Sequence, residues 1–93
     1  MTVVAGDVPD GPFSGVPFLL KDLGQDFQGL PTGSGCNAMR GVVAEQHATV
    51  VERWRGAGLV PFAKTNTPEC GAKAITESEA FGPARNPWNR AHT

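Results

Sequence analysis

Two short apolar runs separated by one amphipathic segment constrain the fold of this chain most strongly. The runs cover residues 16–20 and 59–63, and each has a glycine before it and a lysine after it, as expected of strands buried on both faces. Between them, four apolar residues recur at helical spacing: Val50, Val51, Trp54 and Ala57. Gly58 then provides a helix end. Strand, crossover helix and strand is the signature of parallel α/β architecture.

The rest of the chain offers few further regular elements. Glycine and proline supply 12 and 8 of the 93 residues, and residues 23–41 alone contain five glycines. We therefore predict a long loop over residues 23–41 and loop-like chain after Lys64, with Trp88 packed as an anchor. Parallel sheets need several strands and covered faces, so two strands and one helix bury too little to stand alone. The sequence predicts a slice of a larger α/β domain.

Charge and composition exclude several classes of partner. Eight basic and nine acidic residues give a net charge of −1 without a run of like charge, which argues against nucleic acid. The longest apolar stretch is about six residues, far below the roughly 20 that cross a bilayer, so we expect a cytoplasmic protein without membrane association. The cysteines and histidines lack the spacing of a metal site: Cys36, His47, Cys70 and His92. We therefore expect no metal and no cofactor.

Four phrases carry a resemblance that covers nearly the whole chain. They occupy residues 15–22, 48–53, 64–69 and 81–88, and in this order they resemble the amidase signature family. The resemblance implies an α/β fold with a central mixed sheet flanked by helices, of which residues 1–93 would be a partial domain cut at both ends. It also implies hydrolysis of a carbon–nitrogen amide bond, to a carboxylate and ammonia or an amine, by a serine, cis-serine and lysine triad.

Lys21 closes the first apolar run, and the resemblance implies that it is the catalytic base of this triad. Strand alternation puts Leu20 on one face and Lys21 on the other. If both faces are buried, desolvation disfavours the charged ammonium and leaves neutral amine able to accept a proton. Without the resemblance, Lys21 is better explained as a solvated lysine at a strand end, because lysine is rarely buried. Lys64, at the end of the second run, is structural by the same resemblance.

The two serines of such a triad are not among the serines of this sequence. The resemblance places the bridging serine in a glycine-rich and serine-rich stretch that follows the last phrase, and the nucleophilic serine further on. Ser14, Ser34 and Ser78 all lack the Gly-x-Ser-x-Gly pattern of a hydrolase nucleophile. We therefore expect a polypeptide of these 93 residues alone to show no amidase activity.

Residues 33–38 fit only the loosest form of the dinucleotide-binding motif. Pro31 and Thr32 stand where a buried strand should end, and no clear helix follows. We attribute these glycines to backbone freedom rather than to nucleotide binding.

Two positions depart from the pattern that the resemblance implies. His47 stands ahead of the expected helix where relatives commonly carry a capping aspartate, a loss of about 1 kcal/mol unless Thr49 caps instead. Leu23 follows Lys21 and Asp22 where the relatives that transamidate mischarged tRNA usually carry asparagine. The second departure favours a stand-alone amidase.

Several functions stay open at this point. The first is a fragment of an amidase that acts on a small-molecule amide, whose identity depends on pocket segments outside the sequence. The second is a non-catalytic truncated remnant, or an interaction module that exposes apolar strand edges. A fragment of a tRNA-dependent amidotransferase and a free-standing binding domain are further alternatives, and cooperative unfolding of the monomer would support the last. The sequence carries no signal for the oligomeric state.

Overall fold

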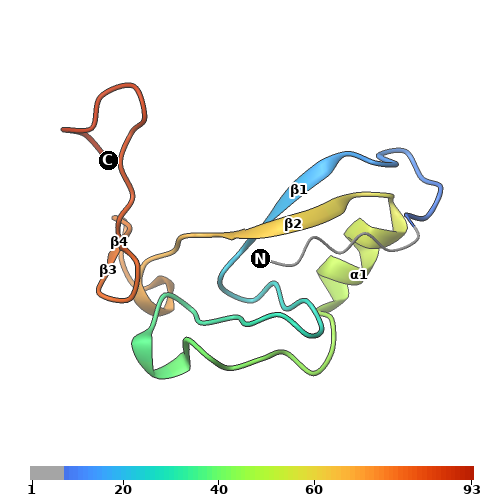
Figure 1. Cartoon of the computed structure of the whole chain (residues 1–93), viewed down its shortest axis with the longest axis horizontal. Helices are drawn as coiled ribbons and strands as arrows, with labels where there is room; N and C mark the ends of the chain where they lie inside the picture. The colour runs from blue at the N-terminus through green and yellow to red at the C-terminus, as the bar shows by residue number, and fades with distance from the viewer. Residues whose placement is uncertain (1–7) are drawn as a thin grey trace.

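The computed structural model describes residues 8–93, and its elements follow the predicted order (Figure 1). Strand β1 (Pro17–Lys21) is followed by a short 3₁₀ helix η1 (Asn37–Met39), helix α1 (Thr49–Gly56) and strand β2 (Val60–Thr65). A second 3₁₀ helix η2 (Glu69–Gly71) and two very short strands, β3 (Glu77–Ser78) and β4 (Gly82–Pro83), complete the chain. Across residues 8–93 no helix has the length and apolarity needed to span a membrane.

Strands β1 and β2 form the parallel pair that the sequence predicts. Leu20 lies opposite Lys64 and Lys21 opposite Thr65, with one irregularity in the register after Phe18. Helix α1 connects the two strands and lies along one face of the pair (Figure 1). The strand–helix–strand unit is therefore confirmed.

The core occupies only the face of the strand pair that α1 covers. Leu20, Phe27 and Val51 are buried there, and the rings of Phe18 and Trp54 pack with centroids 4.9 Å apart. On the opposite face, Leu19 is 46% exposed, because nothing within residues 8–93 covers it. The expectation that both faces of the first strand are buried is therefore wrong for the described chain. We call the uncovered side, which carries Pro17, Leu19 and Lys21, the open face.

Helix α1 has a well-defined end and a weak start. Gly58, at φ +93°, donates its N–H to the Arg55 carbonyl, and the Leu59 N–H reaches the Trp54 carbonyl at 3.1 Å, a Schellman motif. The predicted stop at Gly58 is confirmed. The cap at the start is Ala48, which has no side-chain hydrogen bond, so neither His47 nor Thr49 caps the helix.

His47 instead ties the start of α1 to the loop after β1. The Gln28 backbone N–H donates to His47 Nδ1 at 3.0 Å, and Arg55 Nη1 lies 2.8 Å from His47 Nε2. Phe27 packs edge-on against the imidazole, with ring centroids 4.5 Å apart. Burial and then the Arg55 charge lower the pKa of His47, while the Glu52 carboxylate opposes them.

This contact predicts a loss of stability on acidification. In the folded protein the pKa of His47 lies below its ordinary value of 6.5. The contribution of His47 to the stability of the fold is therefore fully present above pH 6.5 and is lost as the pH falls towards the folded pKa. The thermal midpoint, measured from about pH 7.5 down to 5.5, should fall less steeply in His47→Gln than in the parent. The same substitution at exposed His92 is the control, and an unaltered slope in His47→Gln would exclude this role.

Residues 23–41 form a loop, as predicted, interrupted by the short η1, and the chain up to residue 44 is folded back on itself. Pro31 and Val43 form an antiparallel bridge, and the Thr32 N–H donates to the Val42 carbonyl at 3.1 Å. The turn at η1 reverses the chain between these two segments. The segment before η1 thus lies between the strands and the segment after η1 (Figure 1).

The chain after β2 differs from the prediction in two respects. Strands β3 and β4 pair in antiparallel fashion, although the sequence predicts only loop there. Trp88 is 94% exposed, so the prediction that it packs as an anchor is wrong. Figure 1 shows the segment after β4 standing away from β1, β2 and α1, so Trp88 does not pack against these elements.

Candidate active site

The carboxyl ends of β1 and β2 bring two lysines to the same edge of the strand pair. Lys21 ends β1, and Lys64 is the penultimate residue of β2, paired with Leu20. Partners in register share a face, so Lys64 lies on the covered side with Leu20 and Lys21 lies on the open face. The two amines therefore have different surroundings although their backbones are neighbours.

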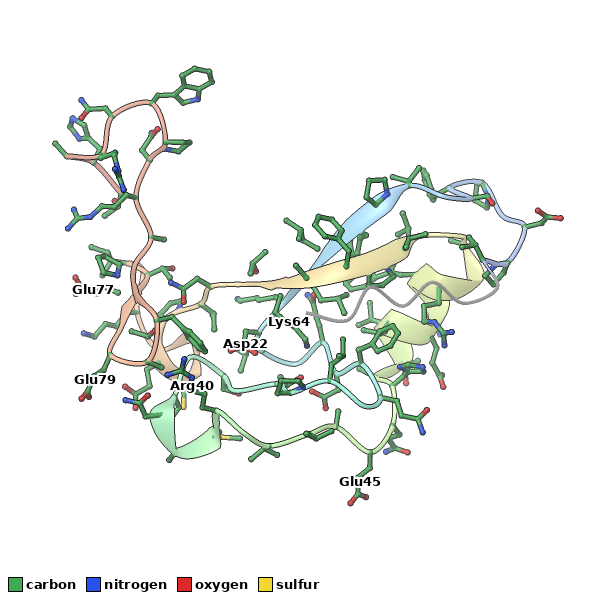
Figure 2. The ribbon with its side chains drawn as sticks, viewed as in Figure 1. Asp22, Arg40, Glu45, Lys64, Glu77 and Glu79 are labelled. Carbon is green, nitrogen blue, oxygen red and sulfur yellow. The ribbon has the colours of Figure 1, made fainter. Side chains whose placement is uncertain are left out.

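Lys64 is the lysine that the structure holds in place. Its Nζ donates to the Gln25 carbonyl at 2.6 Å and to Thr32 Oγ1 at 2.9 Å. Burial lowers the pKa of Lys64, while the carboxylates of Asp22 and Asp26 oppose this shift. Figure 2 shows Lys64 and Asp22 between the strands and the loop that follows β1. The structural role expected for Lys64 agrees with these contacts.

Asp22, the residue after Lys21, is buried and organises the glycine-rich segment. It is only 7% exposed, and its carboxylate accepts the N–H of Gly33 at 2.9 Å and that of Gly35 at 3.2 Å. These amide groups would have to face a phosphate in a dinucleotide site. Because a carboxylate already accepts from them, the contacts support the structural explanation of these glycines.

Lys21 is fixed through its backbone, while its side chain is exposed. The Lys21 N–H donates to Gln25 Oε1 at 2.7 Å. Within residues 8–93 no hydrogen bond joins the Lys21 amine to a serine: Ser78 is buried and accepts from the Phe81 N–H at 3.3 Å, and the Ser34 carbonyl accepts from the Cys70 N–H. None of these serines forms a local triad with Lys21.

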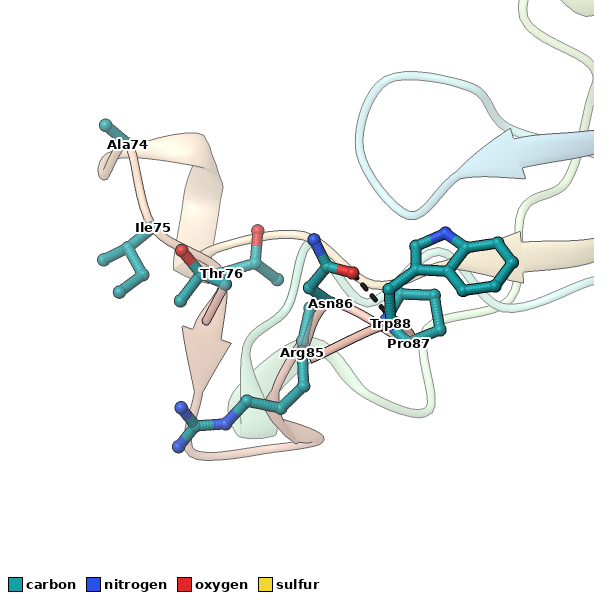
Figure 3. Close-up of a pocket in the computed structure, with 9 residues that line it drawn as sticks. Ala74, Ile75, Thr76, Arg85, Asn86, Pro87 and Trp88 are labelled. Carbon is teal, nitrogen blue, oxygen red and sulfur yellow. Dashed lines mark hydrogen bonds between the residues drawn. The ribbon is translucent and has the colours of Figure 1, made fainter. Parts of the chain in front are cut away.

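Several cavities lie along residues 8–93. One of about 290 Å³ opens at the carboxyl ends of the strands and is lined by Asp22, Lys64, Thr65, Asn66 and Phe81. A larger one of about 500 Å³ lies between residues 74–76 and 84–88, where Asn86 Oδ1 accepts the Trp88 N–H (Figure 3). The first cavity adjoins the residues that follow Lys21, as does another of about 240 Å³, which is lined by Gly24, Asp26, Thr32, Ser34, Met39, Val42 and Ala44.

Comparison with known proteins places this arrangement in a family. The family model described as Amidase matches residues 4–93. The chain belongs to the amidase family. Among curated amidase relatives, it is 48% identical over 85 residues to 6-aminohexanoate-cyclic-dimer hydrolase of Paenarthrobacter ureafaciens, covering 89% of the chain and 17% of that protein. It is 44% identical over 79 residues to a glutamyl-tRNA(Gln) amidotransferase subunit of Acidothermus cellulolyticus, covering 85% and 15%.

A solved amidase structure confirms the fold class. The structure of 6-aminohexanoate cyclic dimer hydrolase complexed with substrate superposes with a TM-score of 0.84 at 49% identity. The match covers 88% of this chain and 17% of that one. The chain thus has the α/β fold of a segment of an amidase, and it spans about 17% of the length of the relatives it matches.

The sequence did not single out Gln25, which contacts both lysines of the amidase segment. Its side chain accepts from the Lys21 N–H and its carbonyl accepts from Lys64 Nζ. A glutamine inside a loop carries no local pattern that reveals contacts to residues four and 39 positions away.

Proposed function

We propose that residues 1–93 are part of an amidase domain that hydrolyses a carbon–nitrogen amide bond, with Lys21 as the catalytic base. The observation that carries the proposal is the position of Lys21 at the carboxyl end of β1, with its backbone held by Gln25 and its amine on the open face. Ligands of open α/β sheets commonly bind outside the carboxyl ends of the strands. The family match over residues 4–93 supports the same role.

The proposed reaction uses a serine, cis-serine and lysine triad whose serines lie outside residues 1–93. The neutral amine of Lys21 takes a proton from the bridging serine, which takes one from the nucleophilic serine. That oxygen attacks the amide carbonyl, backbone N–H groups stabilise the oxyanion, and ammonia or an amine leaves. Water then releases the carboxylate.

A stand-alone amidase of small-molecule amides is the form of this function that we favour. Leu23 stands where the family resemblance leads us to expect asparagine in tRNA-dependent amidotransferases, and the relative of 48% identity is named as a cyclic-dimer hydrolase. An amidotransferase component is the second candidate, because of the 44% identity to the glutamyl-tRNA(Gln) amidotransferase subunit.

Hydrolysis assays on two forms of the protein test the proposal. The protein encoded by the whole reading frame should release amine or ammonia from a linear acyl amide or from the cyclic dimer of 6-aminohexanoate. A polypeptide of residues 1–93 should release none above the buffer rate, because it lacks the triad serines. Failure of the whole protein on every amide offered would favour the non-catalytic remnant, and activity of the 93-residue form would exclude the triad.

A further inference from the structure

Lys64 and Gln25 form a continuous connection between the two strand ends. The Gln25 side chain accepts the Lys21 N–H at 2.7 Å, and the Gln25 carbonyl accepts from Lys64 Nζ at 2.6 Å. Lys64 also donates to Thr32 Oγ1 at 2.9 Å, on the segment that leads to η1. A single glutamine therefore contacts both lysines, one through its side chain and one through its backbone.

This connection holds the chain after β1 in addition to the hydrogen bonds that Asp22 accepts from Gly33 and Gly35. Strand β1 ends at Lys21, and the chain turns through Gly24 at φ +66° before it reaches Gln25. A turn of this kind can change its backbone angles at little cost unless later contacts hold it. Lys64 supplies such contacts from β2, which is itself fixed to β1 by the parallel ladder.

We propose that Lys64 is a positioning residue that holds Lys21 through Gln25. The ammonium of Lys64 fixes the Gln25 carbonyl, and the Gln25 side chain then fixes the end of β1. The direction from which the Lys21 amine leaves the strand is set by this backbone. The inference rests on the proposed function, since positioning matters only if Lys21 is the base. Bonds from an ammonium to a carbonyl are among the stronger hydrogen bonds in proteins, and Lys64 is half-buried.

Hydrogen exchange of the Lys21 amide tests the connection directly. In the protein that contains residues 1–93, Lys64→Met keeps most of the side-chain volume but removes the donor. The Lys21 amide should then exchange about tenfold to a hundredfold faster. The Val60 amide, bonded to the Val16 carbonyl at 2.8 Å at the other end of the strand pair, should change less than about threefold. Equal acceleration at both amides, or none at Lys21, would overturn the proposal.

Two further variants separate this connection from a general effect of charge. Lys73→Met makes the same change at an exposed lysine whose only ion pair among the described residues is a 4.0 Å contact with Glu77, and should leave the Lys21 amide unaffected. Gln25→Met should accelerate exchange of the Lys21 amide as Lys64→Met does. The double variant should add little to either single change, because both act on one connection. Additive effects would count against the proposal.

Kinetics then show whether the position of Lys21 matters for the reaction. Lys64→Met should lower kcat about tenfold while leaving KM for the amide within about twofold, and Lys64→Arg, which keeps the cation and its donors, should recover most of kcat. A rise in KM with unchanged kcat would overturn the positioning role. If the parent protein hydrolyses no amide, the proposed function is wrong, and so is the effect of Lys64 on kcat. If exchange of the Lys21 amide is unaltered in Lys64→Met, only the connection through Gln25 is wrong.

Discussion

Replacing Lys21 by methionine should lower amide hydrolysis by the protein that contains this chain about 10⁴-fold. Without an amine at the end of β1, the bridging serine has no base. Loss of one member of a catalytic triad typically removes most of the rate enhancement that the triad provides. The substitution removes no hydrogen bond of the Lys21 side chain within residues 8–93, because the amine makes none there. The folded structure should therefore survive, as judged by circular dichroism and the thermal midpoint.

Two controls separate loss of a base from loss of a charge. Lys73→Met changes an exposed lysine away from the strand ends and should keep activity within about twofold of the parent. Lys21→Ala leaves space at the strand end, so added methylamine or ethylamine should restore part of the rate in proportion to its neutral form. Activity of Lys21→Met above about a tenth of the parent would exclude Lys21 as the base.

The sequence predicts the strand–helix–strand unit well because each element carries its own local signal. The two apolar runs have β-branched residues and sharp boundaries, and the apolar stripe of α1 ends at Gly58, which adopts φ +93°. The start of α1 is predicted less well. His47 makes its contacts with Gln28 and Arg55, and the first of these partners is 19 residues away, so no local capping pattern describes it.

The surroundings of Lys21 are the part of the candidate site that could not be predicted. Alternation along β1 correctly predicts that the side chains of Lys21 and Leu20 lie on opposite faces of the strand. The burial of each face, however, depends on which segments pack against it. Within residues 8–93 only the Leu20 face is covered, by α1 and by the loop that contains Phe27. The contacts of Lys64 were equally hidden, because they depend on how residues 22–35 fold back rather than on any spacing in the sequence.

Gly35→Ala should be the most damaging small substitution in the loop that follows Lys21. Gly35 adopts φ +64°, and an added Cβ would lie 2.6 Å from the Thr67 carbonyl oxygen and 3.0 Å from that of Pro68. An L-residue in this conformation costs about 1 to 2 kcal/mol, and overpacking against backbone that cannot rotate away adds about 1 to 3 kcal/mol. We expect the free energy of unfolding of the protein that contains residues 1–93, measured in urea, to fall by about 2 to 5 kcal/mol.

Substitutions at two other glycines separate the cost of the positive φ from the cost of the close backbone contact. Gly24 has a similar φ of +66° with nothing near the Cβ position, so Gly24→Ala should cost only the conformational part, about 1 to 2 kcal/mol. Gly41 has neither a positive φ nor a close neighbour, and Gly41→Ala should leave stability within about 1 kcal/mol or raise it slightly. If Gly35→Ala costs no more than Gly24→Ala, the segment held by Asp22 does not pack against residues 67–68 as described.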